Sequence, residues 1–176
     1  MTAFFLALAA IAAASPQATA PVPVVPLIVS LDPVSQQLLA AHNRERALVG
    51  APPLQWDPQL AMAAISYGPT LAALGRLEHS PRASRPGQRE NLWRGTSHAY
   101  LPGQMVGSWT DEKRLFRPGV FPAVSVTGNW LHVSHYTQMI WRTTTRVGCG
   151  IYRSSQWDYL ICRYSPPGNT DGKLVP

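Results

Sequence analysis

Two short runs of strand-forming residues near the carboxyl end constrain the fold of this chain most strongly. Each run contains one of its two cysteines, Cys149 and Cys162, and a polar turn separates the runs. A hairpin that sets the cysteines opposite each other also creates three compatible pairs: Ile151 with Leu160, Val147 with Tyr164, and Arg153 with Asp158. Opposed strand residues lie about 4.5–5.5 Å apart at Cα, which is within reach of a disulfide. We therefore expect an antiparallel hairpin with a Cys149–Cys162 disulfide and a turn at Ser155-Gln156.

The amino-terminal segment predicts export. Residues 1–14 are apolar, carry no charged side chain and end in three alanines, the small-residue pattern of a signal-peptidase site. This run is shorter than the about 20 apolar residues that a spanning helix needs, and no later segment predicts one. Residues 15–30, rich in Pro, Ala and Val, predict an extended linker. We expect a signal peptide over 1–14, a linker over 15–30, and a secreted protein, extracellular or periplasmic, in which the cysteines are oxidised.

The remaining length and composition suit one folded domain over 31–176. Hydrophobic residues make up 45% of the chain and charged residues 14%, which is enough for a full core. Lys and Arg exceed Asp and Glu by six, which favours anionic surfaces as partners. The basic residues are scattered and not interleaved with stacking aromatics, so the pattern argues against a nucleic-acid-binding module. We expect a monomer.

Two Asp-Pro pairs predict helix starts, because Asp caps the free N–H groups and Pro suits the first helical position. The first helix follows Asp32-Pro33, keeps Val34, Leu38, Ala41 and Leu48 at helical spacing, and ends at Gly50. The second follows Asp57-Pro58. Gly68-Pro69 should kink or break it, and Gly75 should close it.

A third helix is predicted over 104–116. Met105, Trp109 and Phe116 fall on one face, and Glu112 lies on the same face. A carboxylate inside an apolar stripe must find a partner or shift its pKa. The alternative is that Glu112 lies at the wet end of the stripe.

The stretch from Trp130 to Trp141 concentrates polar chemistry among aromatics, with His132 and His135 three residues apart. On a helix, His135 shares a face with Gln138 and Met139, so its imidazole would point toward apolar surroundings. Either a satisfied core histidine or a ligand fits this pattern.

Seven motifs together resemble the CAP superfamily, which includes cysteine-rich secretory proteins, insect venom antigen five and plant pathogenesis-related proteins. In chain order they are His42-Asn43 with Arg46; Pro53 to Trp56 with Leu60-Ala61; Glu90-Asn91-Leu92; Trp109 with Glu112; His135 to Trp141; Val147 to Gly150; and Cys162 to Asn169. They span residues 31–169, nearly the whole of the expected mature chain. The resemblance implies an α+β fold, a three-layer α-β-α sandwich with a central antiparallel sheet.

The resemblance also implies a cleft lined by His79, Glu90, Glu112 and His135. The imidazoles would hold Zn²⁺ or another divalent cation, and the carboxylates would orient them or act as general bases. His132 is a reserve ligand, and Ser134 and Gln138 are candidates to support the ligands. Arg89 stands where the family usually has glycine and could pair with Glu90.

Three functions fit this cleft. The leading hypothesis is a binding module for a lipid, a sterol or an extracellular partner, because family members are mostly non-enzymatic. A metal-assisted hydrolase of peptidase type is the first alternative; Ser80 and Ser134 each neighbour a histidine, but adjacency in sequence does not make a nucleophile. The second is a structural or host-interaction protein in which the four residues only form a stabilising polar network.

Overall fold

The computed structural model describes Met1 and residues 31–176, so the predicted signal peptide and linker lie outside the described residues. Within the described part, no helix is both long and apolar enough to cross a membrane.

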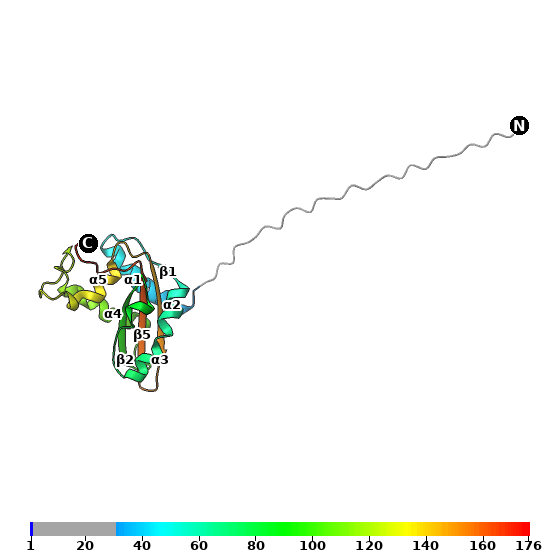
Figure 1. The fold of residues 1–176 in the computed structure, drawn as a ribbon, viewed down its shortest axis with the longest axis horizontal. Coiled ribbons are helices and arrows are strands. Elements are labelled where there is room, and N and C mark those ends of the chain that lie inside the picture. Colours follow the sequence, from blue (N-terminus) through cyan, green and yellow to red (C-terminus); the bar gives the residue numbers. More distant parts are fainter. Residues whose placement is uncertain (2–30) are drawn as a thin grey trace. The chain divides into compact units, whose positions relative to one another are not determined.

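A four-stranded sheet forms the centre of the domain, in the order β1-β4-β5-β2 (Figure 1). Its strands are β1 (Gln55–Trp56), β4 (Arg146–Arg153), β5 (Trp157–Ser165) and β2 (Arg89–Thr96). β2, β5 and β4 run antiparallel, whereas the two-residue β1 runs parallel to β4. The predicted α+β sandwich is confirmed, with a sheet that is antiparallel except for this edge strand.

The hairpin of β4 and β5 has the predicted register. Cys149 pairs with Cys162, and the three further cross-strand pairs are those expected. The two cysteines form a disulfide with a Cα–Cα distance of 4.1 Å. Asp158 is buried and lies 3.4 Å from Nε of Arg153, so the expected ion pair is also present.

Helices cover both faces of the sheet. On one side, α1 (Pro33–Leu48), α4 (Pro102–Thr110) and α5 (Ser134–Ile140) pack on Leu160, Cys162 and Tyr164. On the other, α2 (Pro58–Ile65) and α3 (Gly68–Leu74) pack on Tyr159 and Ile161. Side chains alternate between the faces of a strand, so β5 supplies both cores.

The helix boundaries follow local chemistry. Asp32 and Asp57 each accept two backbone N–H groups at the start of α1 and α2, as predicted. The predicted second helix breaks at Ser66-Tyr67, directly before Gly68-Pro69, which are the first two residues of α3. Gly75 ends α3 in the left-handed conformation with φ of 63°.

Two helix predictions need correction. The third helix is α4 followed by a 3-10 turn, η2 (Asp111–Leu115), so Glu112 leaves the α-helical stripe. In α1, Val34 and Leu48 are exposed (41% and 64%). Its buried residues follow the helical spacing from Leu38 instead: Leu38, Ala41, His42, Glu45 and Arg46.

Short elements complete the domain: η1 (Arg82–Ser84), η3 (Trp130–Val133), and the two-stranded pair of β3 (Gly119–Val120) with β6 (Leu174–Val175). Phe121 and Val133 form a third apolar cluster together with Tyr136 and Val175. In this region Ser125 forms a single antiparallel bridge with Phe116.

Candidate functional site

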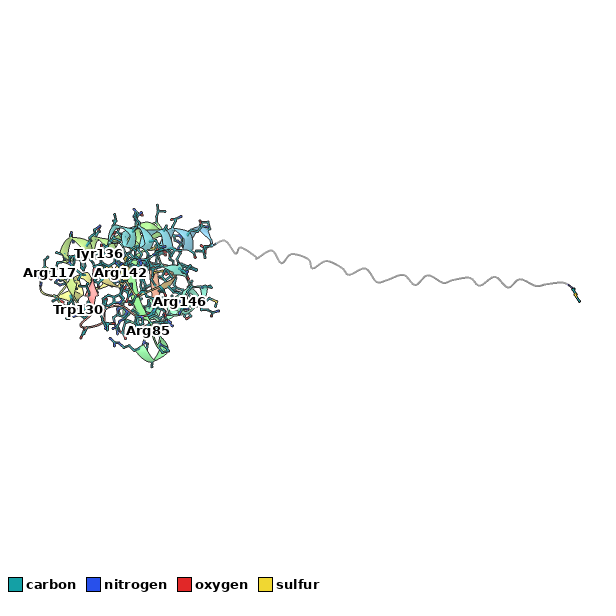
Figure 2. The ribbon with its side chains drawn as sticks, turned by 90° about the horizontal axis from the view of Figure 1, so that it is seen from above. Arg85, Arg117, Trp130, Tyr136, Arg142 and Arg146 are labelled. Atoms are coloured by element: carbon teal, nitrogen blue, oxygen red, sulfur yellow. A yellow bond between two sulfur atoms is a disulfide. The ribbon has the colours of Figure 1, made fainter. Side chains whose placement is uncertain are left out.

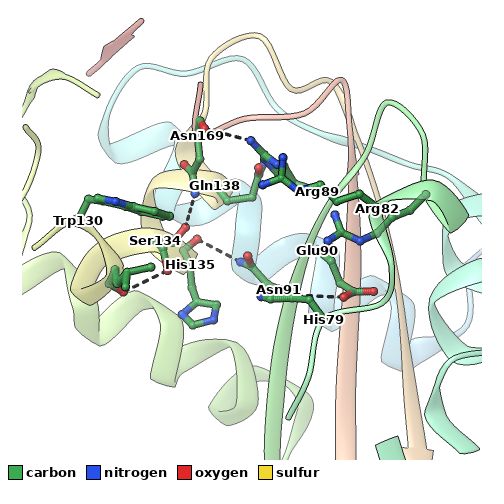
Figure 3. A pocket seen from close by; sticks show the side chains of 12 residues that line it. His79, Arg82, Arg89, Glu90, Asn91, Trp130, Ser134, His135, Gln138 and Asn169 are labelled. Atoms are coloured by element: carbon green, nitrogen blue, oxygen red, sulfur yellow. Dashed lines mark hydrogen bonds and ion pairs between the residues drawn. The ribbon is translucent and has the colours of Figure 1, made fainter. Parts of the chain in front are cut away.

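A cavity of about 210 Å³ opens between β2, η1 and the start of α5 (Figure 3). His79, Glu90 and His135 line it, and Trp130 closes one side. Three of the four residues implied by the resemblance therefore line the same cavity. The fourth, Glu112, does not line it but contacts His135.

Glu112 binds the start of α5 at three points. One oxygen accepts a hydrogen bond from Nδ1 of His135 at 2.6 Å, and the other accepts from the backbone N–H groups of His135 and Tyr136 at 2.9 and 3.0 Å. A carboxylate is stabilised at such free N–H groups, which otherwise have no partner. The predicted need of Glu112 for a partner is thus met by the helix and the imidazole together.

The His135 ring lies flat against Trp109, with centroids 5.9 Å apart and planes inclined by 11°. Trp109 is buried, and its Nε1 donates to the carbonyl of Leu92 in β2. The imidazole is therefore fixed by a carboxylate at one edge and an anchored indole on one face. Its side chain remains 30% exposed.

His79 and Glu90 form the second pair. Glu90 side-chain atoms are fully buried, and one oxygen accepts from Nδ1 of His79 at 3.0 Å and from the backbone N–H of Ser80 at 3.0 Å. The second oxygen accepts from Oγ of Ser80 at 2.8 Å and lies 3.4 Å from Nε of Arg163. Burial would raise the pKa of Glu90, but the hydrogen bonds from His79 and Ser80 outweigh burial and lower it below its ordinary value.

The cation beside Glu90 is Arg163 and not Arg89. Arg163 is the direct cross-strand partner of Glu90, so both side chains stand on the same face of the sheet. Arg89 points the other way, as adjacent strand residues do, and donates to the carbonyls of Gly168 and Asn169 at 3.1 and 3.3 Å. The suggested Arg89–Glu90 pair is wrong.

Both cavity histidines have the same hydrogen-bonding arrangement. An ionised carboxylate only accepts, so Nδ1 of each ring carries the proton that it donates. Neither Nε2 has a hydrogen-bond partner within residues 31–176. A ligating histidine usually has one nitrogen oriented by a carboxylate and the other free for the metal. His79 and His135 fit that donor set.

A divalent cation at this site would take few ligands from the protein. In the described part of the chain, the one group of three ligand residues within 4.8 Å of one another is His42, Cys149 and Cys162. Its cysteines are joined in the disulfide and offer no thiolate. A cation at the cavity would thus be held by the imidazoles of His79 and His135, with water or a bound ligand completing its shell.

The reserve and supporting candidates have other partners. His132 is exposed, is absent from the cavity lining and bonds to Oγ1 of Thr127 at 2.9 Å. Ser134 lines the cavity but donates to the carbonyl of Leu131. Gln138 binds the Gly168 N–H and Thr144. Neither Ser134 nor Gln138 supports a histidine through its side chain.

Sequence reasoning missed a buried chain of hydrogen bonds behind the cavity. His42 contacts the Leu38 carbonyl through Nδ1 at 2.7 Å and the Tyr164 hydroxyl through Nε2 at 2.8 Å. Nδ2 of Asn91 donates to that hydroxyl and to the carbonyl of His135, both at 3.1 Å. We call His42, Tyr164 and Asn91 the core hydrogen-bond chain. It links α1, the sheet and α5, and so fixes the backbone of His135.

Arg46 was also missed as a structural residue. It is fully buried, and its guanidinium donates to four backbone carbonyls, those of Pro52, Met139, Trp141 and Thr144, at 2.6–3.0 Å. It therefore ties the end of α5 to α1. A helical stripe continued from Leu38 through His42 to Arg46 would have identified both polar residues as buried.

Comparisons with known proteins agree with this fold. The family model described as the cysteine-rich secretory protein family, CAP, matches residues 39–164. Pathogenesis-related protein 1A of Nicotiana tabacum is 37% identical over 140 residues, covering 78% of each chain. Pathogenesis-related protein PR-1 of Medicago truncatula is 34% identical over 139 residues, 78% of this chain and 76% of that one.

Among solved structures, NaASP2 with Zn²⁺ superposes with a TM-score of 0.70 at 22% identity, covering 84% of this chain and 87% of that one. BmVAL-1 gives a TM-score of 0.66 at 24% identity and 82% coverage of each chain. These two structures are evidence for the fold alone. With the family model and the plant relatives, the chain belongs to the cysteine-rich secretory protein (CAP) family.

Proposed function

We propose that this chain is a secreted binding module whose cavity holds a divalent cation between His79 and His135. The observation that carries the proposal is the paired arrangement of the two imidazoles. Each has Nδ1 fixed by a glutamate and Nε2 without a protein partner, and both rings border one cavity. A bound cation supplies open coordination positions to an incoming ligand.

The state of the carboxylates favours binding over general-base catalysis. Glu112 has three donors on its two oxygens, and Glu90 has three donors and a buried arginine beside it. A general base needs a free lone pair within reach of water and a pKa near the working pH. The pKa of Glu90 is lowered, which moves it further from neutral pH and makes this carboxylate a weaker base.

Ser80 is equally unsuited to nucleophilic catalysis. A serine nucleophile must be hydrogen-bonded to the imidazole that takes its proton. Here the Ser80 hydroxyl and Nδ1 of His79 both donate to Glu90, so the carboxylate separates them. Within the described part of the cavity, neither Glu90 as a general base nor Ser80 as a nucleophile fits the hydrolase alternative, which favours the binding module.

The proposal extends to a ligand that enters the cavity, for which the sequence suggested a lipid, a sterol or an extracellular partner. Trp130 and Leu131 give the cavity an apolar side, and both are partly exposed. The name of the structural neighbour NaASP2 with Zn²⁺ records a zinc-containing member of the same fold. These points support a ligand that meets both the cation and an apolar wall.

Isothermal titration of the exported protein with Zn²⁺ at pH 7 tests the proposal. His79→Ala and His135→Ala should each weaken binding by about tenfold or more, because each removes one of two protein ligands. His132→Ala is the matched control and should leave binding unchanged. Binding should weaken as pH falls, because imidazole must be neutral to coordinate. The same proteins, with and without Zn²⁺, are then titrated with a fatty acid and a sterol.

Two results would reject the cation site. If His132→Ala abolishes binding and His135→Ala leaves it intact, the ligands are misassigned. If the wild-type protein binds no Zn²⁺ at pH 7, the two pairs are structural contacts only.

A further inference from the structure

One wall of the cavity is built from three arginines. Arg82 lies in η1, Arg85 follows directly after η1, and Arg89 begins β2. Figure 3 shows Arg82 and Arg89 on the side of the cavity away from Trp130. We call these three residues the arginine wall.

None of the three guanidinium groups of this wall forms an ion pair with a carboxylate within the described chain. No carboxylate lies within 4.0 Å of any of the three guanidinium groups in residues 31–176. Glu90, which borders the same cavity, is already bound by His79, Ser80 and Arg163.

The three cations also lie close enough to repel one another. Burial lowers the pKa of Arg89, its neighbours Arg82 and Arg85 lower it further, and Asp171 partly offsets this. Burial likewise lowers the pKa of Arg85, which is only 7% exposed, while the charge of Glu90 acts in the opposite direction. Grouping like charges in a half-enclosed space opposes folding unless an anion offsets it.

Each arginine retains N–H groups for a ligand. Arg85 donates to the carbonyls of Ser80 and Gln88 through Nε and Nη1, which holds the group in place and leaves Nη2 without an acceptor. Arg89 is held through Nε and Nη2, which leaves Nη1. Arg82 makes no side-chain hydrogen bond within the part of the chain described. Two anchored guanidinium groups with N–H groups to spare, and one exposed guanidinium group, are suited to an oxyanion with several oxygens.

We propose that the arginine wall binds the phosphoryl or sulfuryl group of an organic monoester, and that the organic part packs on Trp130 and Leu131. A phosphoryl or sulfuryl group has three terminal oxygens to share among three guanidinium groups that line one cavity, whereas a planar carboxylate offers two. The apolar side chains across the same cavity give the substituent its contact. The site uses none of the proposed cation ligands, so it stands independently of Zn²⁺.

The test is titration of the exported protein with phenyl phosphate, inorganic phosphate and acetate by isothermal calorimetry, after passage over a chelating resin to remove metal. Phenyl phosphate should bind most tightly, inorganic phosphate more weakly, and acetate least. Arg82→Gln should weaken phenyl phosphate binding about tenfold, as expected for one charge-assisted hydrogen bond. Arg82→Lys keeps the charge but loses the two-pronged guanidinium group. Its affinity for phenyl phosphate should lie between those of the wild type and Arg82→Gln.

Arg117→Gln is the matched control, since it removes the same charge from an exposed residue that does not line the cavity; Figure 2 shows Arg117 apart from Arg85. It should change the affinity by less than about twofold, because salt screens a distant exposed charge. Trp130→Ala should bring phenyl phosphate down to the affinity of inorganic phosphate. Arg82 is exposed and unbonded, so its variants are expected to fold; their melting curves check this.

A last arm distinguishes a soluble ester from a lipid headgroup. Vesicles containing phosphatidic acid are sedimented with the protein, with phosphatidylcholine vesicles as reference, in the presence and absence of excess phenyl phosphate. If excess phenyl phosphate reduces binding to the phosphatidic acid vesicles, the lipid headgroup binds at the arginine wall. If phenyl phosphate binds at the wall but does not reduce vesicle binding, the ligand is a soluble ester. The proposal is overturned if Arg82→Gln and Arg117→Gln weaken phenyl phosphate binding equally, or if acetate binds as well as phosphate.

Discussion

His42 in the core and the two cavity histidines engage Nδ1 in a similar way and differ at Nε2. In all three rings a nearby oxygen holds Nδ1, a backbone carbonyl for His42 and a carboxylate for His79 and His135. Nε2 of His42 meets the Tyr164 hydroxyl, whereas Nε2 of each cavity histidine has no partner in the described chain. A histidine with both nitrogens satisfied contributes to stability, and one with a free, oriented nitrogen is available to a ligand.

The burial of the three rings also separates His42 from the two cavity histidines. His42 is fully buried, between α1 and the sheet, and burial lowers its pKa to about 4. His79 and His135 keep exposed fractions of 53% and 30% at the cavity. Substitutions at these positions should therefore separate folding from binding.

The largest expected effect is on folding. His42→Ala should lower the free energy of unfolding by about 3 kcal/mol, because it leaves a cavity and removes the partner of the Tyr164 hydroxyl. His79→Ala, at an exposed position, should cost about 1 kcal/mol or less. Urea denaturation of the oxidised proteins measures both. Equal losses for the two variants would remove the distinction between core and cavity.

The second effect is the dependence of stability on pH. Since His42 has a folded pKa of about 4 and an ordinary unfolded value of about 6.5, the unfolded chain takes up a proton first as pH falls. Stability from this group is complete above about pH 6.5 and is lost progressively toward pH 4, with a loss of about 2 kcal/mol by pH 5.

Urea titrations of the wild-type protein at pH 7 and pH 5 measure this loss. His42→Gln should show a smaller difference between the two pH values, because glutamine does not titrate. An unchanged difference in His42→Gln would assign the pH dependence to other groups.

The smallest expected effect is on Zn²⁺ affinity, through the orientation of the His135 imidazole by Glu112. Glu112→Gln retains the size of the side chain and removes its charge, so α5 should stay folded while His135 is held less firmly. Zn²⁺ affinity should fall by about tenfold, within the range seen when a residue that orients a ligand is changed. The calorimetric titration described for the histidine variants measures it. A variant that binds Zn²⁺ as tightly as the wild type would show that Glu112 only caps α5.

The sequence predicted local and pairwise features well. The register of β4 and β5 followed from alternation of side chains and the position of two cysteines, and both Asp-Pro helix starts depend on neighbouring atoms. The family resemblance supplied His79 and Glu90, which no local pattern distinguishes. Residue-level reasoning reached Glu112 and His135 separately, but their contact spans 23 residues and depends on the turn at η2.

The features that sequence reasoning missed share a physical cause. The core hydrogen-bond chain joins residues from α1, β2 and β5 that are far apart in sequence, so no spacing rule reveals it. Arg46 has no acidic partner among residues 31–176, and its four carbonyl acceptors become visible only when the loops are placed. The Arg89–Glu90 pairing failed because adjacency along a strand puts side chains on opposite faces.

The most direct test of the account is long-range ¹H–¹⁵N nuclear magnetic resonance of the histidine rings, with and without Zn²⁺. His42, His79 and His135 should all show the tautomer protonated at Nδ1. Addition of Zn²⁺ should shift Nε2 of His79 and His135 together and leave His42 and His132 unchanged. Coordination through Nδ1 of either cavity histidine, or a Zn²⁺-dependent shift of His42, would contradict the account.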